Sequence, residues 1–287
     1  MLDNKKTNEE NKKRTTGFSV VVTVVIVLLL LTSLPNNWLI PALNWIECWV
    51  TETYYKYAPN LDETIGLEYE KDYSLDGYVC SGAGNAQYSS KKMSVVVIAE
   101  EYEGNAVVGI KRNAFKNYKD NNHIGIVVIP KSVKIIGENA FSNCGLTTIV
   151  FRKDSLLTTI EKYAFYNNPN IEEISLPTTV EYIGEGVFAI SGTLSNGENA
   201  SLKKMDLASN VKLKTIGAYA FCRQERLEVV ILPVTLTEIG NFAFEGCSSL
   251  KEIEYRGKIS QWNKIKGAEN ISIKVKCTDG YLENQTP

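Results

Sequence analysis

The stretch LPVTLTEIGNFAFEGCSSL, residues 232–250, contains a motif that recurs through the chain. The motif reads I-x-x-x-A-F, with Val187 replacing alanine in one copy, and its six copies end at Phe115, Phe141, Phe165, Phe188, Phe221 and Phe244. Successive phenylalanines are separated by 26, 24, 23, 33 and 23 residues. Self-similarity at a period of about 20 to 50 residues is typical of solenoids, in which each unit buries its apolar side chains only against its neighbours.

Each copy of the motif is followed by a strand-like segment with the pattern L-x-x-I-x-L. The six segments span residues 124–129, 146–151, 171–176, 202–207, 227–232 and 250–255. One strand in each coil predicts a repeat solenoid that is mainly β, with short turns or helices and one parallel sheet. The phenylalanines are expected to form a buried spine. Longer spacers at residues 116–123 and 189–201 indicate two inserted loops, and the tight corners of the coils are expected at four recurring glycines, Gly137, Gly184, Gly217 and Gly240.

The repeat resembles the BspA-like leucine-rich repeat family of surface proteins. The resemblance rests on IPKSVKIIGENAFSNC (129–144), LPTTVEYIGEGVF (176–188) and the stretch 232–250. Residues 67–115 and 255–280 are similar to the segments that precede and follow the repeats in that family. The resemblance implies a leucine-rich repeat solenoid, but it says little about a ligand, because function resides in sites rather than in the scaffold.

The N-terminal region predicts a membrane anchor. Residues 18–34, FSVVVTVVIVLLLLTSL, carry no charge and are long enough to reach the lower limit of a transmembrane helix. Lys12, Lys13 and Arg14 lie directly before them, so the positive-inside rule places the N-terminus in the cytoplasm and exports the rest of the chain. We expect a single-pass plasma membrane protein with an extracellular repeat domain. Secretion after signal cleavage is the alternative, although no A-x-A site follows the apolar run.

Three of the four tryptophans, Trp38, Trp45 and Trp49, follow the apolar run closely. In a helix they share one face, which suits the membrane interface, and packing of this helix onto the repeat domain is the alternative. Near the other end of the repeats, Ser260 is expected to cap a short helix that places Trp262 over the last coil. The predicted organisation is a cytoplasmic tail (1–17), a transmembrane anchor (18–34), a juxtamembrane segment (35–66), an N-terminal cap (67–107), a solenoid (108–256) and a C-terminal cap (257–287).

The composition argues against most catalytic chemistry. A net charge of −2 gives no general reason to bind nucleic acid. His123 is the single histidine and the six cysteines contain no C-x-x-C pair, so we expect no catalytic residue, no cofactor and no metal site. The cysteines are expected to be small buried residues of the ladder, with a disulfide between Cys222 and Cys247 left open. A hydrolase that uses the inserted loops is the weakest alternative.

The outward positions of the strands form the candidate binding face, because solenoids bind partners on such continuous surfaces. Apolar positions flank a charged middle, in which Glu172 and Glu173 are expected to pair with Lys203 and Lys204 across neighbouring coils. The predicted function is a non-catalytic scaffold that binds an unknown protein or glycan, in adhesion; a structural or envelope-assembly protein that binds components of its own cell surface is the alternative. The face comprises Ile126, Val128, Val150, Glu172, Glu173, Lys203, Lys204, Asp206, Glu228, Val229, Ile231 and Glu252.

Overall fold

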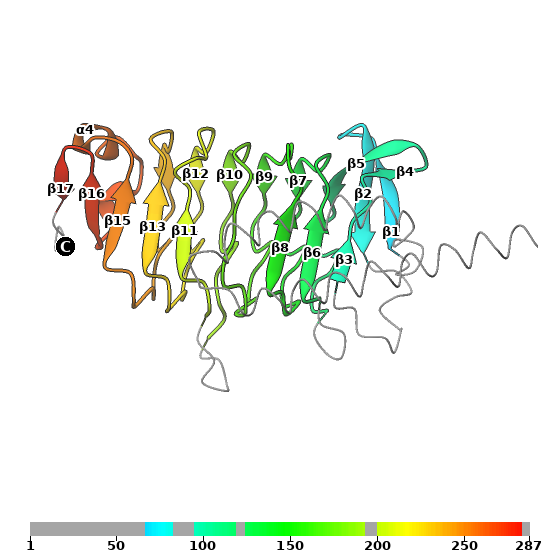
Figure 1. Cartoon of the computed structure of the whole chain (residues 1–287), viewed down its shortest axis with the longest axis horizontal. Helices are drawn as coiled ribbons and strands as arrows, with labels where there is room; N and C mark the ends of the chain where they lie inside the picture. The colour runs from blue at the N-terminus through cyan, green and yellow to red at the C-terminus, as the bar shows by residue number, and fades with distance from the viewer. Residues whose placement is uncertain (1–66, 83–94, 119–123, 193–199, 283–287) are drawn as a thin grey trace, which may run out of the picture. The chain divides into compact units, whose positions relative to one another are not determined.

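The computed structural model describes residues 67–82, 95–118, 124–192 and 200–282 (Figure 1). The anchor predicted at residues 18–34 and the face predicted for Trp38, Trp45 and Trp49 lie outside these ranges, as does His123. Among the residues in these ranges, no helix combines the length and the apolar character needed to cross a bilayer.

Short strands follow one another through the whole of the described chain. The N-terminal part contains β1 (Glu68–Asp72), β2 (Gly77–Gly82), β3 (Val95–Val97), β4 (Glu101–Tyr102) and β5 (Asn105–Ile110). The coils supply β6 (Ile126–Ile129), β7 (Ile135–Ile136), β8 (Thr148–Phe151), β9 (Thr159–Ile160), β10 (Tyr182–Ile183), β11 (Lys204–Asp206), β12 (Thr215–Ile216), β13 (Val229–Leu232), β14 (Glu238–Ile239) and β15 (Glu252–Tyr255). The C-terminal part contains α4 (Ile259–Trp262), the 3-10 helix η2 (Ala268–Asn270), β16 (Lys274–Cys277) and β17 (Gly280–Leu282).

The coils stack in parallel, as Figure 1 shows, and most carry two strands rather than the single strand predicted. The additional strand is only two residues long and ends at the isoleucine of the I-x-x-x-A-F motif. These short strands join β1, β2 and β5 in a continuous sheet ordered β1-β2-β5-β7-β9-β10-β12-β14, with β4 paired to β5. Their isoleucines align in register from Ile110 to Ile239. The described residues therefore form a mainly β solenoid with little helix, in which the short strands make one sheet and the longer strands make two.

The longer strands form an interrupted sheet. β3, β6 and β8 make one parallel group. β11, β13, β15 and β16 make another, to which β17 adds antiparallel. The strand predicted at residues 171–176 is absent, although Ile171, Ile174 and Leu176 are buried as its alternation requires. Among the described residues, only two backbone hydrogen bonds reach this part of the coil from the following one, from Ser201 to the Pro169 carbonyl (2.8 Å) and from Lys203 to the Glu172 carbonyl (3.4 Å).

The side chain of Asn168 bonds two neighbouring coils just before this segment. Its Oδ1 accepts hydrogen bonds from the N–H groups of Cys144 (3.1 Å) and Leu146 (3.0 Å). Its Nδ2 donates to the carbonyl oxygens of Phe141 (2.8 Å) and Phe165 (2.9 Å). Asn168 is only 2% exposed, so a buried carboxamide joins two coils where the long strands do not pair.

The core is the predicted phenylalanine spine. Its six rings stack from coil to coil with centroids 5.1, 5.5, 5.6, 5.5 and 5.5 Å apart and nearly parallel planes. All six side chains are 5% exposed or less. Such offset stacking adds to the free energy of burying the rings, and it fixes the separation of neighbouring coils.

The four recurring glycines allow the coils to approach closely. A Cβ atom on Gly137, Gly184, Gly217 or Gly240 would lie 2.7, 2.6, 2.5 or 2.1 Å from the backbone of the preceding coil. These glycines are not left-handed, so backbone contact between coils, rather than the conformational freedom of a corner, requires them.

The residue three positions after each spine phenylalanine completes the inner ladder. In four coils this position, which we call the donor column, carries Cys144, Asn168, Gln224 and Cys247. Each donates a hydrogen bond to the carbonyl oxygen of the preceding coil's spine phenylalanine, at 2.8, 2.8, 2.6 and 3.2 Å in that order. The two cysteines are therefore buried, as predicted, but act as thiol donors and not only as small apolar residues.

Hairpins and a short helix close the stack. β1 pairs antiparallel with β2 at the N-terminal end, and β16 pairs antiparallel with β17 at the C-terminal end. The N–H of Ile259, the first residue of α4, donates to the carboxylate of Asp279 (2.8 Å), whereas Ser260, the predicted cap, lies inside the helix. Trp262 is 4% exposed and meets Tyr255, the last residue of β15, edge-on at 5.3 Å, as expected for a side chain that covers the last coil.

Candidate functional site

The candidate binding face is only partly exposed. Ile126, Val150 and Glu252 are half-buried, and Val128 and Ile231 are each only 7% exposed. The two buried side chains were expected to lie on the surface, so the apolar margins of the face are smaller than the alternation suggests. The remaining seven positions are exposed, namely Glu172, Glu173, Lys203, Lys204, Asp206, Glu228 and Val229.

The register of the C-terminal long-strand sheet adds residues that the sequence analysis missed. Lys204, Val229, Glu252 and Lys274 lie side by side on successive strands. A second row runs through Asp206, Ile231, Glu254 and Lys276. The alternation in ISIKVKC, residues 271–277, could have revealed β16 and its two lysines.

The expected ion pairs between the glutamates and the lysines do not form. Lys204 instead pairs with Asp206 on its own strand, with Nζ and Oδ2 3.0 Å apart. Burial raises the pKa of Asp206, but the hydrogen bonds from Lys204 and from the Ala208 N–H outweigh it and leave the pKa lowered. No ion pair within the described residues involves Glu172, Glu173, Lys203, Glu228 or Glu252. Because residues 171–176 do not pair as a strand, Glu172 and Glu173 lack the register that the prediction assumed.

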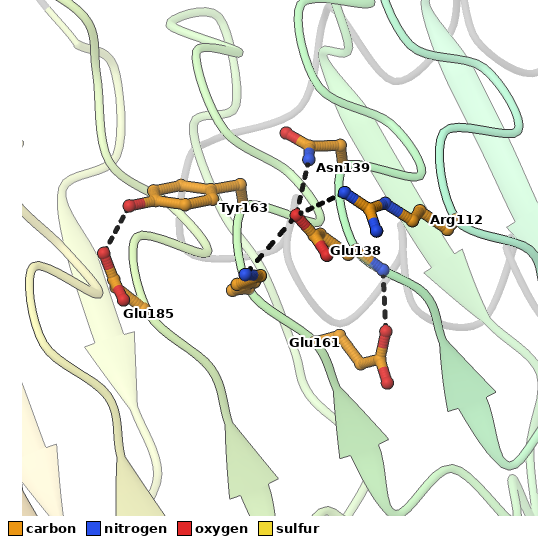
Figure 2. Close-up of polar contacts among 7 residues, drawn as sticks. Arg112, Glu138, Asn139, Glu161, Tyr163 and Glu185 are labelled. Atoms are coloured by element: carbon orange, nitrogen blue, oxygen red, sulfur yellow. Dashed lines mark hydrogen bonds and ion pairs between the residues drawn. The ribbon is translucent and has the colours of Figure 1, made fainter.

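A polar ladder follows the short strands and ties neighbouring coils together (Figure 2). Glu138 lies between Arg112 (3.3 Å) of the preceding coil and Lys162 (3.6 Å) of the following one. Its backbone N–H donates to the carboxylate of Glu161 at 2.9 Å. Partly exposed ion pairs of this kind contribute about 0 to 1 kcal/mol each. The ladder therefore fixes the alignment of the coils, and the carboxylates of Glu138 and Glu161 are already bonded to groups of neighbouring coils.

An aromatic column lies beside this ladder and was also missed. Tyr163, Tyr219 and Phe242 each stand two residues before a spine phenylalanine and have left-handed backbones with φ of 58, 55 and 59°. Asparagine or glycine fills this position in the other coils, Asn113, Asn139 and Gly186. Bulky side chains rarely adopt this conformation, which costs about 1 to 2 kcal/mol per residue. Tyr219 and Phe242 are 40% and 53% exposed and their rings stack with centroids 5.2 Å apart. The turns that follow the short strands β12 and β14 therefore present an aromatic surface.

Tyr163 and the two cysteines of the donor column are poorly reactive. The hydroxyl of Tyr163 donates to Glu185, and this bond, more than its burial, raises the pKa of Tyr163 to about 12. Burial raises the pKa of Cys144 and of Cys247 to about 12. Cys222 and Cys247 are both free thiols, so the disulfide left open by the sequence is not formed. Across the ranges that the structure describes, histidine, cysteine and carboxylate side chains form no group of three or more that is suited to a metal ion.

One solved structure shares the solenoid geometry, and others are similar in sequence to parts of the chain. The pneumococcal vaccine antigen PcpA is 25% identical, with a TM-score of 0.54, over 66% of this chain and 48% of PcpA. This chain thus spans about half the length of PcpA. A leucine-rich repeat protein of T. pallidum is 23% identical, with a TM-score of 0.43, over 66% of this chain and 68% of its own. One from Bacteroides capillosus is 22% identical, with a TM-score of 0.35, over 45% and 89% of the two chains. No curated protein matches.

The comparison with protein families gives a direct assignment. The family described as "BspA type Leucine rich repeat region" matches in six copies at residues 108–201 and 197–266, which together make up more than half of the chain. These residues contain the spine, the donor column and both series of strands. The chain therefore belongs to the BspA-type leucine-rich repeat family.

Proposed function

We propose that the chain is a cell-surface protein whose repeat domain is a non-catalytic scaffold that binds a protein or glycan ligand, in adhesion. Residues 18–34 anchor it in the plasma membrane, with the N-terminus in the cytoplasm and the repeats outside. Membership of a leucine-rich repeat family supports a binding role, because such solenoids present continuous surfaces to partners.

The charge at the exposed Lys203 and Glu228 and at the half-buried Glu252 is the observation that carries this proposal. None of the three belongs to an ion pair among the described residues. Each lies on or directly beside a strand of the five-stranded sheet, so a ligand can meet charges that need not first be separated from internal partners. A complementary surface gains specificity and association rate from such charges.

Charge reversal tests the binding role. Purified full-length protein is measured against arrays of glycans and of extracellular matrix proteins, with Lys203→Glu plus Lys204→Glu as the test variant. Lys212→Glu plus Lys214→Glu is the matched control, because it makes the same change of charge at exposed lysines next to β12. We expect the test variant to weaken binding about tenfold, or about 1.4 kcal/mol, and the control to bind like the parent. Equal effects of the two variants would contradict a role for this face.

Protease treatment of intact cells tests the topology. Peptides from residues 67–282 are expected in the released material, and their absence would contradict an extracellular repeat domain. Crosslinking on the same cells separates adhesion from envelope assembly: partners that come only from the cell's own surface would favour a structural role over adhesion.

A further inference from the structure

Each coil is hydrogen-bonded to the next by a regular pattern around the spine. The N–H groups of Tyr219, Phe221 and Arg223 donate to the carbonyl oxygens of the coil that follows, at 3.1, 2.8 and 2.6 Å. The N–H groups of Asn139, Phe141 and Asn143 do the same three coil pairs earlier, at 3.1, 2.8 and 2.9 Å. Each coil thus donates from three N–H groups at alternate residues, and three carbonyl groups at alternate residues of the next coil accept these hydrogen bonds.

The last coil has no such partner. The equivalent N–H groups belong to Phe242, Phe244 and Gly246, and none of them has an acceptor among the described residues. The backbone of the C-terminal cap runs alongside the last coil and pairs with it only as far as Lys266, whose carbonyl accepts a hydrogen bond from the Ile239 N–H at 2.9 Å. The next residue, Gly267, is left-handed (φ 83°) and leads into η2, whose backbone bonds are local.

A cleft of about 430 Å³ remains between the last coil and the cap. One wall is the segment from Phe242 to Ser248, which carries the three unpaired N–H groups, and the other is Asn270 to Ile273. Ile271 and Ile273 are half-buried, and the exposed Phe242 ring lies at this wall in its left-handed conformation. The cleft thus combines a row of main-chain donors with apolar sides, and its volume is within the range of about 300 to 1,000 Å³ typical of ligand sites.

We propose that this cleft binds a peptide segment of a partner protein, whose carbonyl groups at alternate residues accept hydrogen bonds from Phe242, Phe244 and Gly246. The coils themselves identify this chemistry, because the same three positions in preceding coils bind peptide carbonyls. Recognition of this kind adds a segment to an exposed main-chain edge, with affinity from backbone bonds and specificity from side-chain pockets. The site is separate from the long-strand face and does not depend on the function proposed for it.

A synthetic peptide tests the proposal on the full-length protein. The probe is a fluorescent peptide with the sequence of residues 237–248 and with serine in place of Cys247. In the fold this segment supplies the three carbonyl groups that accept hydrogen bonds from Tyr219, Phe221 and Arg223. A second peptide carries alkene isosteres in place of the peptide bonds whose carbonyls belong to residues 241, 243 and 245. It keeps the side chains but lacks the three acceptors. We expect saturable binding of the first peptide by fluorescence anisotropy, and at least tenfold weaker binding of the second.

Two single variants locate the binding. Ser248→Trp and Ser272→Trp fill the cleft from opposite walls at exposed positions, and each is expected to weaken binding at least tenfold. Ser209→Trp, an exposed serine in the turn after β11, is the control and should bind like the parent, with circular dichroism checking that all three are folded. The proposal is overturned if the peptide does not bind, if both cleft variants bind like the control, or if acetate displaces the peptide so readily that the site is one for small anions.

Discussion

Removal of the Asn168 carboxamide is expected to destabilise the repeat domain strongly. This side chain satisfies four main-chain groups of two coils: the N–H groups of Cys144 and Leu146, and the carbonyls of Phe141 and Phe165. In Asn168→Ala all four lose their partner at a site that is 2% exposed.

The magnitude follows from the number of groups left unpaired. A buried polar group without a partner costs about 1 to 3 kcal/mol, so four groups set an upper limit of about 12 kcal/mol. Water entering the vacated space restores part of the bonding, because a polar site with several partners can hold an ordered molecule. We therefore expect a loss of about 3 to 5 kcal/mol in the free energy of unfolding.

Urea denaturation of the purified protein, followed by circular dichroism, measures this loss. Asn170→Ala is the matched control, since Asn170 is exposed two residues further along the chain, and it should change the unfolding free energy by less than about 0.5 kcal/mol. A loss below about 1 kcal/mol for Asn168→Ala would refute the reasoning, because the coils would then be held together without the carboxamide.

Three further predictions concern the packing of the coils and the titration of their side chains. Gly240→Ala places a Cβ atom 2.1 Å from the preceding backbone, so we expect thermal unfolding to show a loss of about 1 to 3 kcal/mol, as for other overpacked sites. Cys144 and Cys247, with pKa values raised to about 12, should react with a thiol reagent at pH 8 only after denaturation; rapid labelling of the native protein would contradict their burial. Because the pKa of Tyr163 is raised to about 12 in the fold, the stability gained from its bond to Glu185 is present below about pH 10 and is lost as the pH rises toward about 12. The unfolding midpoint of Tyr163→Phe should depend less on pH in that window, and an unchanged pH dependence would contradict the assignment.

Much of the fold follows from the period of the sequence. The phenylalanines and the L-x-x-I-x-L segments recur often enough to identify both the spine and five of the six predicted long strands. The short strands ending at isoleucines such as Ile136 and Ile160 were missed, because a two-residue strand is too short to show an alternation of apolar and polar residues. The absence of a strand at residues 171–176 could not be predicted from the pattern, because Ile171, Ile174 and Leu176 keep the buried alternation of the other copies although no strand pairing forms there.

The candidate surface was harder to predict than the core. Burial of Val128 and Ile231 depends on what covers an outward position, and a strand's alternation gives only the direction of a side chain. The prediction that Glu172 and Glu173 pair with lysines was wrong for a related reason. Cross-strand pairing needs a defined register between two strands, and residues 171–176 do not form a strand.

The donor column shows why a repeat of this kind varies in sequence without losing its geometry. Cys144, Asn168, Gln224 and Cys247 differ in size and polarity, yet each directs one donor to the same carbonyl of the coil before it. A position whose role is to donate a hydrogen bond can be occupied by a residue with a thiol or a carboxamide. A position whose role is to fill volume, such as the phenylalanine of the spine, cannot. Donors of different strength are therefore expected to give the coils different stabilities. Since each coil contacts only its neighbours, Cys144→Ala and Cys247→Ala should lower the protection from hydrogen exchange mainly in the two coils that each thiol joins, and a loss spread evenly over the described coils would contradict this coil-by-coil account.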